Sequence, residues 1–274
     1  MTIDVRYPTN PAELETLSPH ELRRRLVLEE LFVPGEVRLV LSLHDRLVLG
    51  GALPQRSVLS LPVPDELRAR HFCERRELAI VCLEGHGAIE VDGAGYTMTA
   101  EDILYVAKGA RSVELSGDDA VFYLISAPAH AAQSTVLVRR DEADAEEIGQ
   151  AALASRRTLR KYVHEGGAKS CQLTVGITTL AEGSVWNTMP CHTHERRSEV
   201  YLYFGLGDDG RVIHLCGRPT ATRNVVLADR EAVISPPWSV HTGAGTRSYK
   251  FVWSTAGENM TYNDMDMVDT RTLR

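Results

Sequence analysis

Residues 183–199 read GSVWNTMPCHTHERRSE, a stretch that places a histidine pair shortly before an acidic residue. In a strand, residues two apart share a face, so His192 and His194 can both direct an imidazole at one ion. Glu199 follows His194 at an odd offset, which a regular strand would place on the opposite face. The stretch therefore predicts a bulge or bend within residues 195–198 that lets Glu199 join the histidines.

A fourth ligand is expected from a second motif downstream. Residues 236–243 read PPWSVHTG, a proline-bounded turn that leads to His241. A histidine pair alone, or His241 alone, is more often structural or hydrogen-bonded, but the two motifs together with Glu199 favour metal binding. Three imidazoles and one carboxylate suit zinc, manganese, iron or cobalt. The remaining histidines, His214 among them, lie in no comparable motif, and we assign them no role in the site.

Outward from this stretch, the chain reads as short β-strands. Segments rich in Val, Leu and Ile are broken by Gly, Pro and Asp at intervals of roughly 8 to 12 residues, as in a sandwich or barrel. This texture stops between about 128 and 162, where a polar, Ala-rich region suits a helical or loose connection. The expected strands are 37–42, 77–83, 88–91, 121–125, 171–179, 200–204, 212–215, 225–227, 232–234 and 249–253.

Two short helices are expected before the first strand. Asn10-Pro11 can start one helix. Ser18-Pro19-His20-Glu21 is a capping box with proline at the first helical position, and the helix that it starts should run to about Phe32. The patterns together predict an all-β, mainly β fold with a short N-terminal helical segment. Its expected parts are a first domain over 1–135, a connection over 136–160 and a second domain over 161–274.

A short internal repeat relates the two halves. Residues 74–77 read ERRE and residues 195–199 read ERRSE, and each copy leads into an apolar strand and a Gly/Asp turn. A repeat this short also arises by chance, but it supports two related halves. The first copy lacks the histidines of the second, so we expect one metal ion per chain, held by the second domain.

Composition excludes several classes of protein. With 30 Lys+Arg against 37 Asp+Glu the net charge is -7, and no basic run exceeds Arg23-Arg24-Arg25, so nucleic acid is not an expected partner. The five cysteines form no C-x-x-C pair, which fits a reducing cytoplasm. No apolar run is long enough for a membrane span, and the N-terminus lacks a signal pattern. We therefore expect a cytoplasmic protein with no membrane association.

The metal motifs resemble those of known families. H-x-H-x4-E followed by P-x-x-x-x-H is similar to the two cupin metal motifs, although Trp238 stands where the second motif usually has glycine. Residues 186–197 (WNTMPCHTHERR), 232–236 (AVISP) and 257–259 (GEN) closely resemble the 5-dehydro-4-deoxy-D-glucuronate isomerase family, also called 5-keto-4-deoxyuronate isomerases. The likeness continues over nearly the whole chain, at 45–46, 50–51, 72–78, 127–130 and 264–266.

This resemblance implies a bicupin fold of two cupin-like β-barrels, with zinc bound in the C-terminal barrel. The implied ligands are His192, His194, Glu199 and His241. It also implies a homo-oligomer, hexameric in the family, and a small keto-deoxy-uronate as the substrate.

The implied reaction is an aldose-ketose isomerisation, an intramolecular oxidoreduction. It converts 5-dehydro-4-deoxy-D-glucuronate to 3-deoxy-D-glycero-2,5-hexodiulosonate in the bacterial breakdown of pectin-type and other uronate polysaccharides. Two other classes stay open: a cupin metal-dependent dioxygenase, which would use the same ligands for iron and oxygen, and a non-catalytic sugar-binding bicupin.

Such a reaction needs a group that removes a proton beside the carbonyl and a group that returns it. The candidates are Glu195, which lies beside the ligands, Glu258, and Tyr201 or Tyr203, which strand alternation places on the ligand face. For each of them an ordinary surface or packing role is an equally good interpretation.

The substrate carboxylate also needs a cationic partner, for which an Arg guanidinium has the matching two-point geometry. The candidates lie near the ligand segment in the sequence and are Arg160, Lys161, Arg196 and Arg197.

Overall fold

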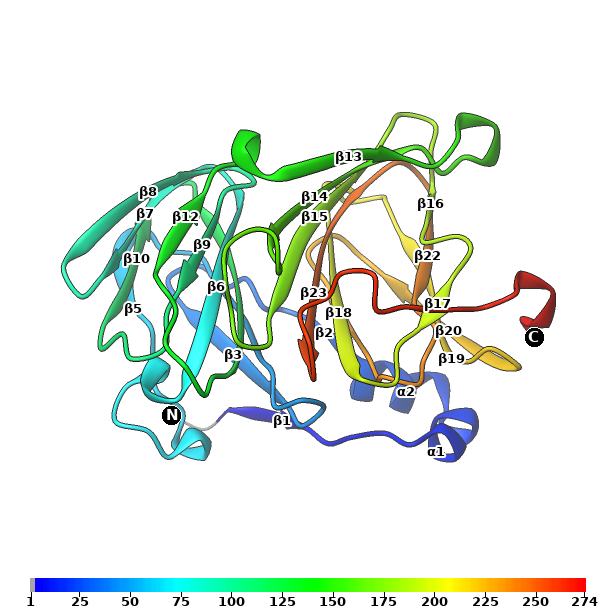
Figure 1. Ribbon diagram of the computed structural model, residues 1–274, viewed down its shortest axis with the longest axis horizontal. Coiled ribbons are helices and arrows are strands. Elements are labelled where there is room, and N and C mark those ends of the chain that lie inside the picture. Colours follow the sequence, from blue (N-terminus) through cyan, green and yellow to red (C-terminus); the bar gives the residue numbers. More distant parts are fainter. Residues whose placement is uncertain (1–2) are drawn as a thin grey trace. The chain divides into compact units, whose positions relative to one another are not determined.

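The computed structural model describes residues 3–274, which form two compact units (Figure 1). The first unit comprises the N-terminal residues up to Arg6, Glu30–Asp144 and Lys161–Val175. The second unit comprises Tyr7–Glu29, Ala145–Arg160 and Gly176–Arg274. No helix within residues 3–274 is long and apolar enough to cross a membrane.

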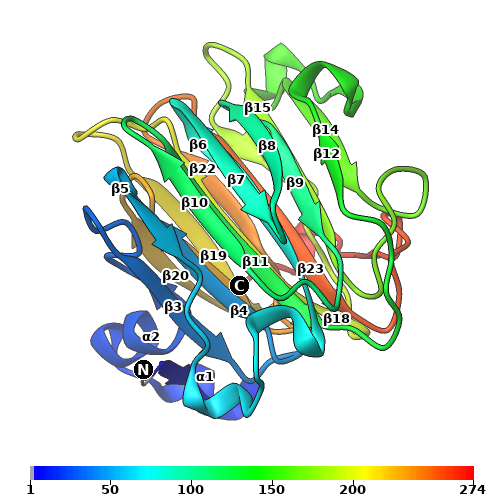
Figure 2. The ribbon, with the colours of Figure 1, turned by 90° about the vertical axis from the view of Figure 1, so that its left-hand side faces the viewer.

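The first unit contains a seven-stranded sheet, in the order β1-β3-β4-β11-β6-β9-β12, and a four-stranded sheet, in the order β5-β10-β7-β8. Figure 2 shows the four-stranded sheet with its strands side by side. All pairings are antiparallel except that of β1 with β3. The strands are β1 (Asp4–Arg6), β3 (Val37–Ser42), β4 (Val48–Ala52), β5 (Gln55–Ser60), β6 (Arg76–Glu84), β7 (His86–Val91), β8 (Ala94–Thr99), β9 (Ile103–Val106), β10 (Val113–Gly117), β11 (Val121–Pro128) and β12 (Val136–Val138).

A second set of sheets repeats this plan, with the orders β13-β14-β15-β23-β18-β21-β2 and β16-β22-β19-β20 and a separate pair, β17-β24. Its residues belong to the second unit, except for 144, 161–163 and 174–175 in β13, β14 and β15, which belong to the first. The strands are β2 (Val27–Leu28), β13 (Asp144–Ile148), β14 (Arg157–Val163), β15 (Thr174–Leu180), β16 (Trp186–Asn187), β17 (His192–Thr193), β18 (Arg197–Phe204), β19 (Val212–Arg218), β20 (Ala221–Leu227), β21 (Ala232–Ser235), β22 (Thr242–Gly245), β23 (Lys250–Gly257) and β24 (Asp266–Met267).

The two copies of the internal repeat open equivalent strands. Arg76 begins β6, which lies between β11 and β9, and Arg197 begins β18, which lies between β23 and β21. Leu78, Ile80 and Cys82 alternate along β6 and join the apolar core of the first unit. The predicted mainly β class is therefore confirmed, and the repeat corresponds to the fifth strand in the order of each seven-stranded sheet.

The N-terminal helices start where the sequence predicts but end earlier. Asn10 caps α1 (Pro11–Thr16), and Ser18 and Glu21 form the capping box of α2 (Pro19–Leu26). The expectation that the second helix runs to about Phe32 is wrong. Val27 and Leu28 instead form β2, whose backbone pairs with β21.

The helices also group differently from the predicted division. Leu14, Leu22 and Leu26 lie in the apolar core of the second unit, so α1 and α2 belong to that compact unit. The domain limits at 1–135 and 161–274 stay a prediction.

The region 136–160 was expected to be a helical or a loose connection, and it contains no α-helix. It contains β12, β13, the start of β14 and two single-turn 3-10 helices, η3 (Arg140–Glu142) and η4 (Ala151–Leu153). Four of the five residues of β13 are exposed, from Asp144 to Glu147. A polar composition hides such a strand, because an edge strand needs a hydrogen-bonding neighbour rather than an apolar face.

Candidate metal centre

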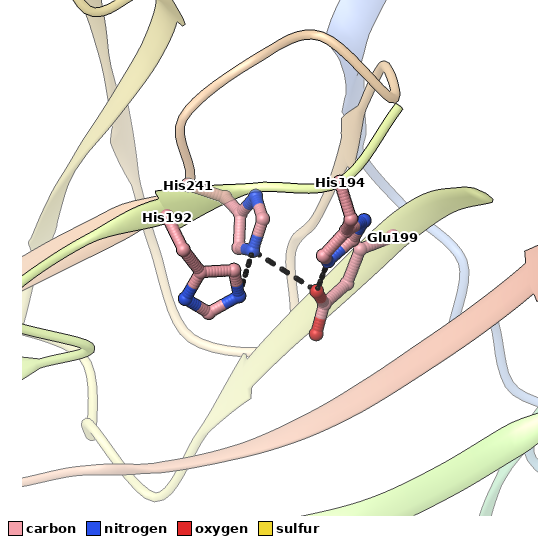
Figure 3. A group of neighbouring side chains, drawn as sticks. All are labelled: His192, His194, Glu199 and His241. Atoms are coloured by element: carbon pink, nitrogen blue, oxygen red, sulfur yellow. Dashed lines mark hydrogen bonds and ion pairs between the residues drawn. The ribbon is translucent and has the colours of Figure 1, made fainter. Parts of the chain in front are cut away.

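Four side chains of the second unit converge on one point (Figure 3). His192 lies on β17, His194 follows that strand, Glu199 lies on β18 and His241 directly precedes β22. All four residues are buried, and one ligand atom from each lies within 4.8 Å of the others. The structure thus brings together the four residues that the two motifs single out.

A short turn brings Glu199 to the histidines. β17 ends at Thr193 and β18 begins at Arg197, whose backbone N–H donates to the carbonyl of His194 over 3.4 Å. The bend that the odd offset requires is therefore a turn at 195–196. Within β18, Glu199 pairs with Ser235 on one side and Thr255 on the other, so neighbouring strands on both sides hold its backbone.

The ligand atoms face one another at short range. Glu199 Oε2 lies 2.8 Å from His194 Nε2 and 3.0 Å from His241 Nε2. His241 Nε2 in turn lies 3.0 Å from His192 Nε2. Two rings with unshared electron pairs at this separation repel each other unless a proton or a cation lies between them.

Backbone carbonyls orient two of the rings. His194 Nδ1 lies 3.0 Å from the carbonyl oxygen of Arg197, and His241 Nδ1 lies 3.2 Å from that of Ser239. A carbonyl only accepts hydrogen bonds, so in each neutral ring Nδ1 carries the proton and Nε2 turns an unshared pair toward the centre of the group. This is the tautomer that a metal ligand needs, fixed in the way that metal-binding histidines usually are.

Burial and mutual contact set the charges of the group. Burial, helped by His241, lowers the pKa of His192 to about 3. Burial opposes ionisation of Glu199, but the charge and hydrogen bonds of His241 and His194 hold its pKa well below the ordinary value. Burial lowers the pKa of His194, yet the hydrogen bond and charge of Glu199 outweigh it and raise that pKa. The group thus joins one buried carboxylate to three imidazoles, a donor set whose negative charge a divalent cation can balance.

Further polar side chains lie next to the candidate ligands, among them Tyr201, Tyr203 and His214. The ring of Tyr201 meets that of His241 edge-on at 5.6 Å between centroids, and it meets the ring of His214 at 5.9 Å. His214 is fully buried, and its Nδ1 lies 2.8 Å from the hydroxyl of Tyr203. In the part of the chain that the structure describes, His214 Nε2 and Asn187 Nδ2 are buried without a hydrogen-bond partner.

His214 is a buried residue near the candidate ligands that neither sequence motif indicates. The signal was present in β19, where Val212, His214 and Cys216 are buried while Ile213 is 45% exposed. This alternation places His214 on the inner face with its apolar neighbours.

Three of the candidates for proton transfer, Glu195, Glu258 and Tyr201, occupy different environments. Glu195 lies exposed in the turn after His194, and Glu258 is also exposed, with its backbone N–H donating to the carbonyl of Arg196 over 3.0 Å. Tyr201 is buried, and its hydroxyl lies 3.4 Å from Thr188 Oγ1. Burial, followed by the charge of Glu199, raises the pKa of Tyr201 well above its ordinary value. Tyr201 is thus the only one of the three that contacts a candidate ligand through its ring.

The cationic candidates differ in how their charge is already used. Lys161 Nζ lies 2.8 Å from Asp144. Arg196 binds Asp264 at 2.6 Å and Asp266 at 2.9 Å, and the guanidinium of Arg197 donates to backbone carbonyls of residues 261, 262 and 264. Arg160 is half-buried on β14 and pairs with none of the carboxylates in residues 3–274.

Comparison with known proteins adds a sequence relationship to this geometry. Residues 27–270 match the model of the KduI/IolB family. A protein of Kineococcus radiotolerans is 48% identical over 99% of this chain and its own full length, and one of Shouchella clausii is 43% identical over 99% of this chain and its own full length. Both relatives are named 4-deoxy-L-threo-5-hexosulose-uronate ketol-isomerase.

Solved structures support the fold. An IolB-like protein from Salmonella typhimurium superimposes with a TM-score of 0.68 at 13% identity, over 92% of this chain and 91% of that one. Oxalate decarboxylase from Lactobacillus farciminis superimposes with a TM-score of 0.56 at 10% identity, over 82% of each chain. At such identities the likeness concerns the fold alone, and it confirms the prediction of a bicupin.

Proposed function

The chain belongs to the KduI/IolB family, and from this we propose that it is a 4-deoxy-L-threo-5-hexosulose-uronate ketol-isomerase. Its reaction is the aldose-ketose isomerisation of 5-dehydro-4-deoxy-D-glucuronate to 3-deoxy-D-glycero-2,5-hexodiulosonate, in uronate and pectin catabolism. The enzyme is proposed to be cytoplasmic and to form a homo-oligomer, a hexamer by family resemblance.

The observation that carries the proposal is the buried group His192, His194, Glu199 and His241. Its donor set suits one divalent ion per chain, for which we propose zinc. When bound, such an ion polarises the substrate carbonyl as a Lewis acid. Every further step depends on side chains around it.

Burial separates the proposed roles of the proton-transfer candidates. Because its pKa is raised well above the ordinary value, Tyr201 stays protonated near neutral pH and can donate a hydrogen bond but not act as a base. We assign the base role to the exposed carboxylates Glu195 or Glu258, and activity of the Gln variant of each distinguishes them. Proton removal beside the carbonyl and its return to the neighbouring carbon then complete the isomerisation.

The proposed partner of the substrate carboxylate is Arg160. Of the four cationic candidates, Lys161 and Arg196 are paired with aspartates and Arg197 donates to backbone carbonyls, whereas Arg160 has no carboxylate partner among the described residues. Lys161 and Arg196 stay proposals for the same role, but binding a substrate there requires that each first release its aspartate.

The test is conversion of 5-dehydro-4-deoxy-D-glucuronate by the purified, metal-replete protein, without oxygen, nucleotide or redox cofactor. We expect the ketose product, and chelation should stop its formation. In heavy water, a side-chain base would place deuterium at the carbon that was the aldehyde, whereas a hydride shift would leave that carbon unlabelled.

Two other outcomes would identify the rival classes. Oxygen consumption on another substrate, with no isomerisation, would indicate the cupin dioxygenase. Sugar-acid binding with no turnover of any uronate would indicate the non-catalytic bicupin.

A further inference from the structure

We propose that the first unit carries a separate binding site for a small oxyanion, either a sugar acid or a sugar phosphate. A cavity of about 360 Å³ in this unit is lined by Arg46, Leu67, Ala69, Arg75, Arg76 and Pro128. Its volume lies in the range of small-molecule sites. Three guanidinium groups and no carboxylate line it, and guanidinium groups match carboxylate and phosphate oxygens in two-point geometry.

Arg76 is the buried charged side chain of this site. It is 7% exposed, and its guanidinium donates only to neutral oxygens: the hydroxyl and carbonyl of Ser126 and the carbonyl of Arg46. Burial, with a smaller effect of Arg46, lowers its pKa to about 10. A buried cation without an ion-pair partner is costly, so an anion in the cavity would stabilise it.

Burial lowers the pKa of Arg76, and the buried carboxylate of Glu77, the next residue in the chain, opposes this through its charge but forms no ion pair with it. Glu77 points its two oxygens at other donors, accepting the backbone N–H groups of Cys171, Gln172 and Leu173 at 2.6, 2.8 and 3.0 Å. It also accepts the hydroxyl of Tyr105 at 2.8 Å. Its oxygens are therefore occupied elsewhere.

The other two arginines leave positive charge available to a ligand. Arg75 donates to the carbonyls of Leu67 and Arg68 at 2.7 and 2.8 Å, and these are neutral partners. Arg46 is exposed, and its side chain forms no ion pair with the described residues. In an adjoining depression, Glu74 is already paired with Arg70 at 2.8 Å.

The second unit has an arginine at the position equivalent to Arg76, and its surroundings differ. Arg197 begins β18 as Arg76 begins β6, but its guanidinium is occupied by the carbonyls of the C-terminal segment at 261, 262 and 264. In the first unit, Arg76 donates to the carbonyls of Arg46 and Ser126 and also lines the cavity. The strand-opening arginine of the first unit thus lines a cavity, whereas that of the second unit is covered by the C-terminal segment.

The experiment measures binding of D-glucuronate, D-glucose 6-phosphate and neutral D-glucose to the full-length metal-bound protein by titration calorimetry. We expect Arg46→Gln to weaken binding of the preferred anion at this site about tenfold, because one charged hydrogen-bond donor is lost. Arg46→Lys should recover part of the affinity, and Ala69→Asp should abolish binding by placing a negative charge in the cavity. Arg56→Gln is the matched control, because Arg56 is an exposed arginine of the first unit outside the cavity.

The preferred anion identifies the source, carboxylate or phosphate, and isomerase activity should be unchanged in Arg46→Gln. The proposal fails if neither anion binds, if D-glucose binds as tightly as the anions, or if Arg46→Gln binds as tightly as Arg56→Gln. None of these results depends on turnover, so they are distinguishable from a failure of the isomerase assignment.

Discussion

At the scale of single residues, His214 shows how the interior of the second unit responds to acid. Its ring is fully buried, with the Tyr203 hydroxyl at 2.8 Å from Nδ1. Burial, with a smaller effect of His241, lowers its pKa from 6.5 to about 3. In the unfolded chain the same ring takes a proton near pH 6.5. Between pH 6.5 and about 3 the unfolded state therefore binds more protons than the folded state.

From this difference we predict that the free energy of unfolding of the second unit falls as the pH drops below 6.5. The contribution of His214 is at most about 1.4 kcal/mol per pH unit. His214→Gln, which keeps an acceptor for Tyr203, should make the fall shallower. Urea unfolding at pH 7, 6, 5 and 4 measures it by tryptophan fluorescence, because all 3 tryptophans lie in the second unit. An exposed control, His20→Gln, should keep the wild-type slope, and equal slopes in both variants would contradict the prediction.

At the scale of elements, α1 depends on a side chain from far along the chain. It has only six residues, too few to be stable alone. Arg223 on β20 donates to the carbonyls of Leu14 and Glu15 at 2.9 and 3.0 Å and to that of Leu17 at 2.8 Å. These are carbonyls that the end of a helix leaves without partners.

We predict that Arg223→Gln loosens α1. Amide hydrogen exchange should become faster over residues 11–17, and the free energy of unfolding should drop by about 1–3 kcal/mol, because partly buried carbonyl acceptors lose a charged donor. Arg218→Gln is the control, since Arg218 only approaches Glu15 at 3.9 Å on the surface. If exchange over 11–17 were equal in the two variants, Arg223 would not anchor the helix.

The elements also show which parts of the fold are predictable from sequence. The start of α2 was predictable, because Ser18 and Glu21 form a capping box within one turn of chain. The end of α2 was not, because Val27 pairs with Val233 of β21, and no local pattern reports a partner so distant. The edge strand β13 was hidden for the same reason: its polar residues favour strand only once a neighbour is present.

At the scale of the whole molecule, the two halves share a plan but not a ligand set. Glu199 is two residues past Arg197 and pairs with Ser235, whereas Leu78 is two residues past Arg76 and pairs with Val106. The first unit thus has an apolar side chain where the second has its carboxylate.

We therefore predict about one divalent ion per chain by elemental analysis. Glu199→Gln keeps the size of the side chain but removes its charge, and it should lower metal affinity at least about tenfold. His241→Ala should act in the same direction, with the β-rich circular dichroism spectrum retained in both variants. Two equivalents in the wild-type protein would overturn the one-site prediction, and full metal content in Glu199→Gln would remove Glu199 from the ligands.

The candidate metal ligands were predictable because they lie within short sequence motifs. The candidate substrate-binding cations were less predictable, because their availability depends on which carboxylates they pair with. Two motifs were enough to select the four converging residues. The availability of the cations depended on partners that no motif indicates: Lys161 binds Asp144, and Arg196 binds Asp264, 68 residues away. Strand alternation could have found His214, but only with the bounds of β19 known.

The pairing of β2 with β21 also affects the order in which the chain can fold during synthesis. Leu28 is made early in synthesis, and its partner Ala232 emerges about 200 residues later. At 5–20 residues per second, that delay is roughly 10–40 seconds. During this interval Leu14, Leu22 and Leu26 have not yet received the strands that bury them, whereas most of the first unit is synthesised in between. The N-terminal segment of the nascent chain therefore keeps these three leucines without their partners until translation is nearly complete.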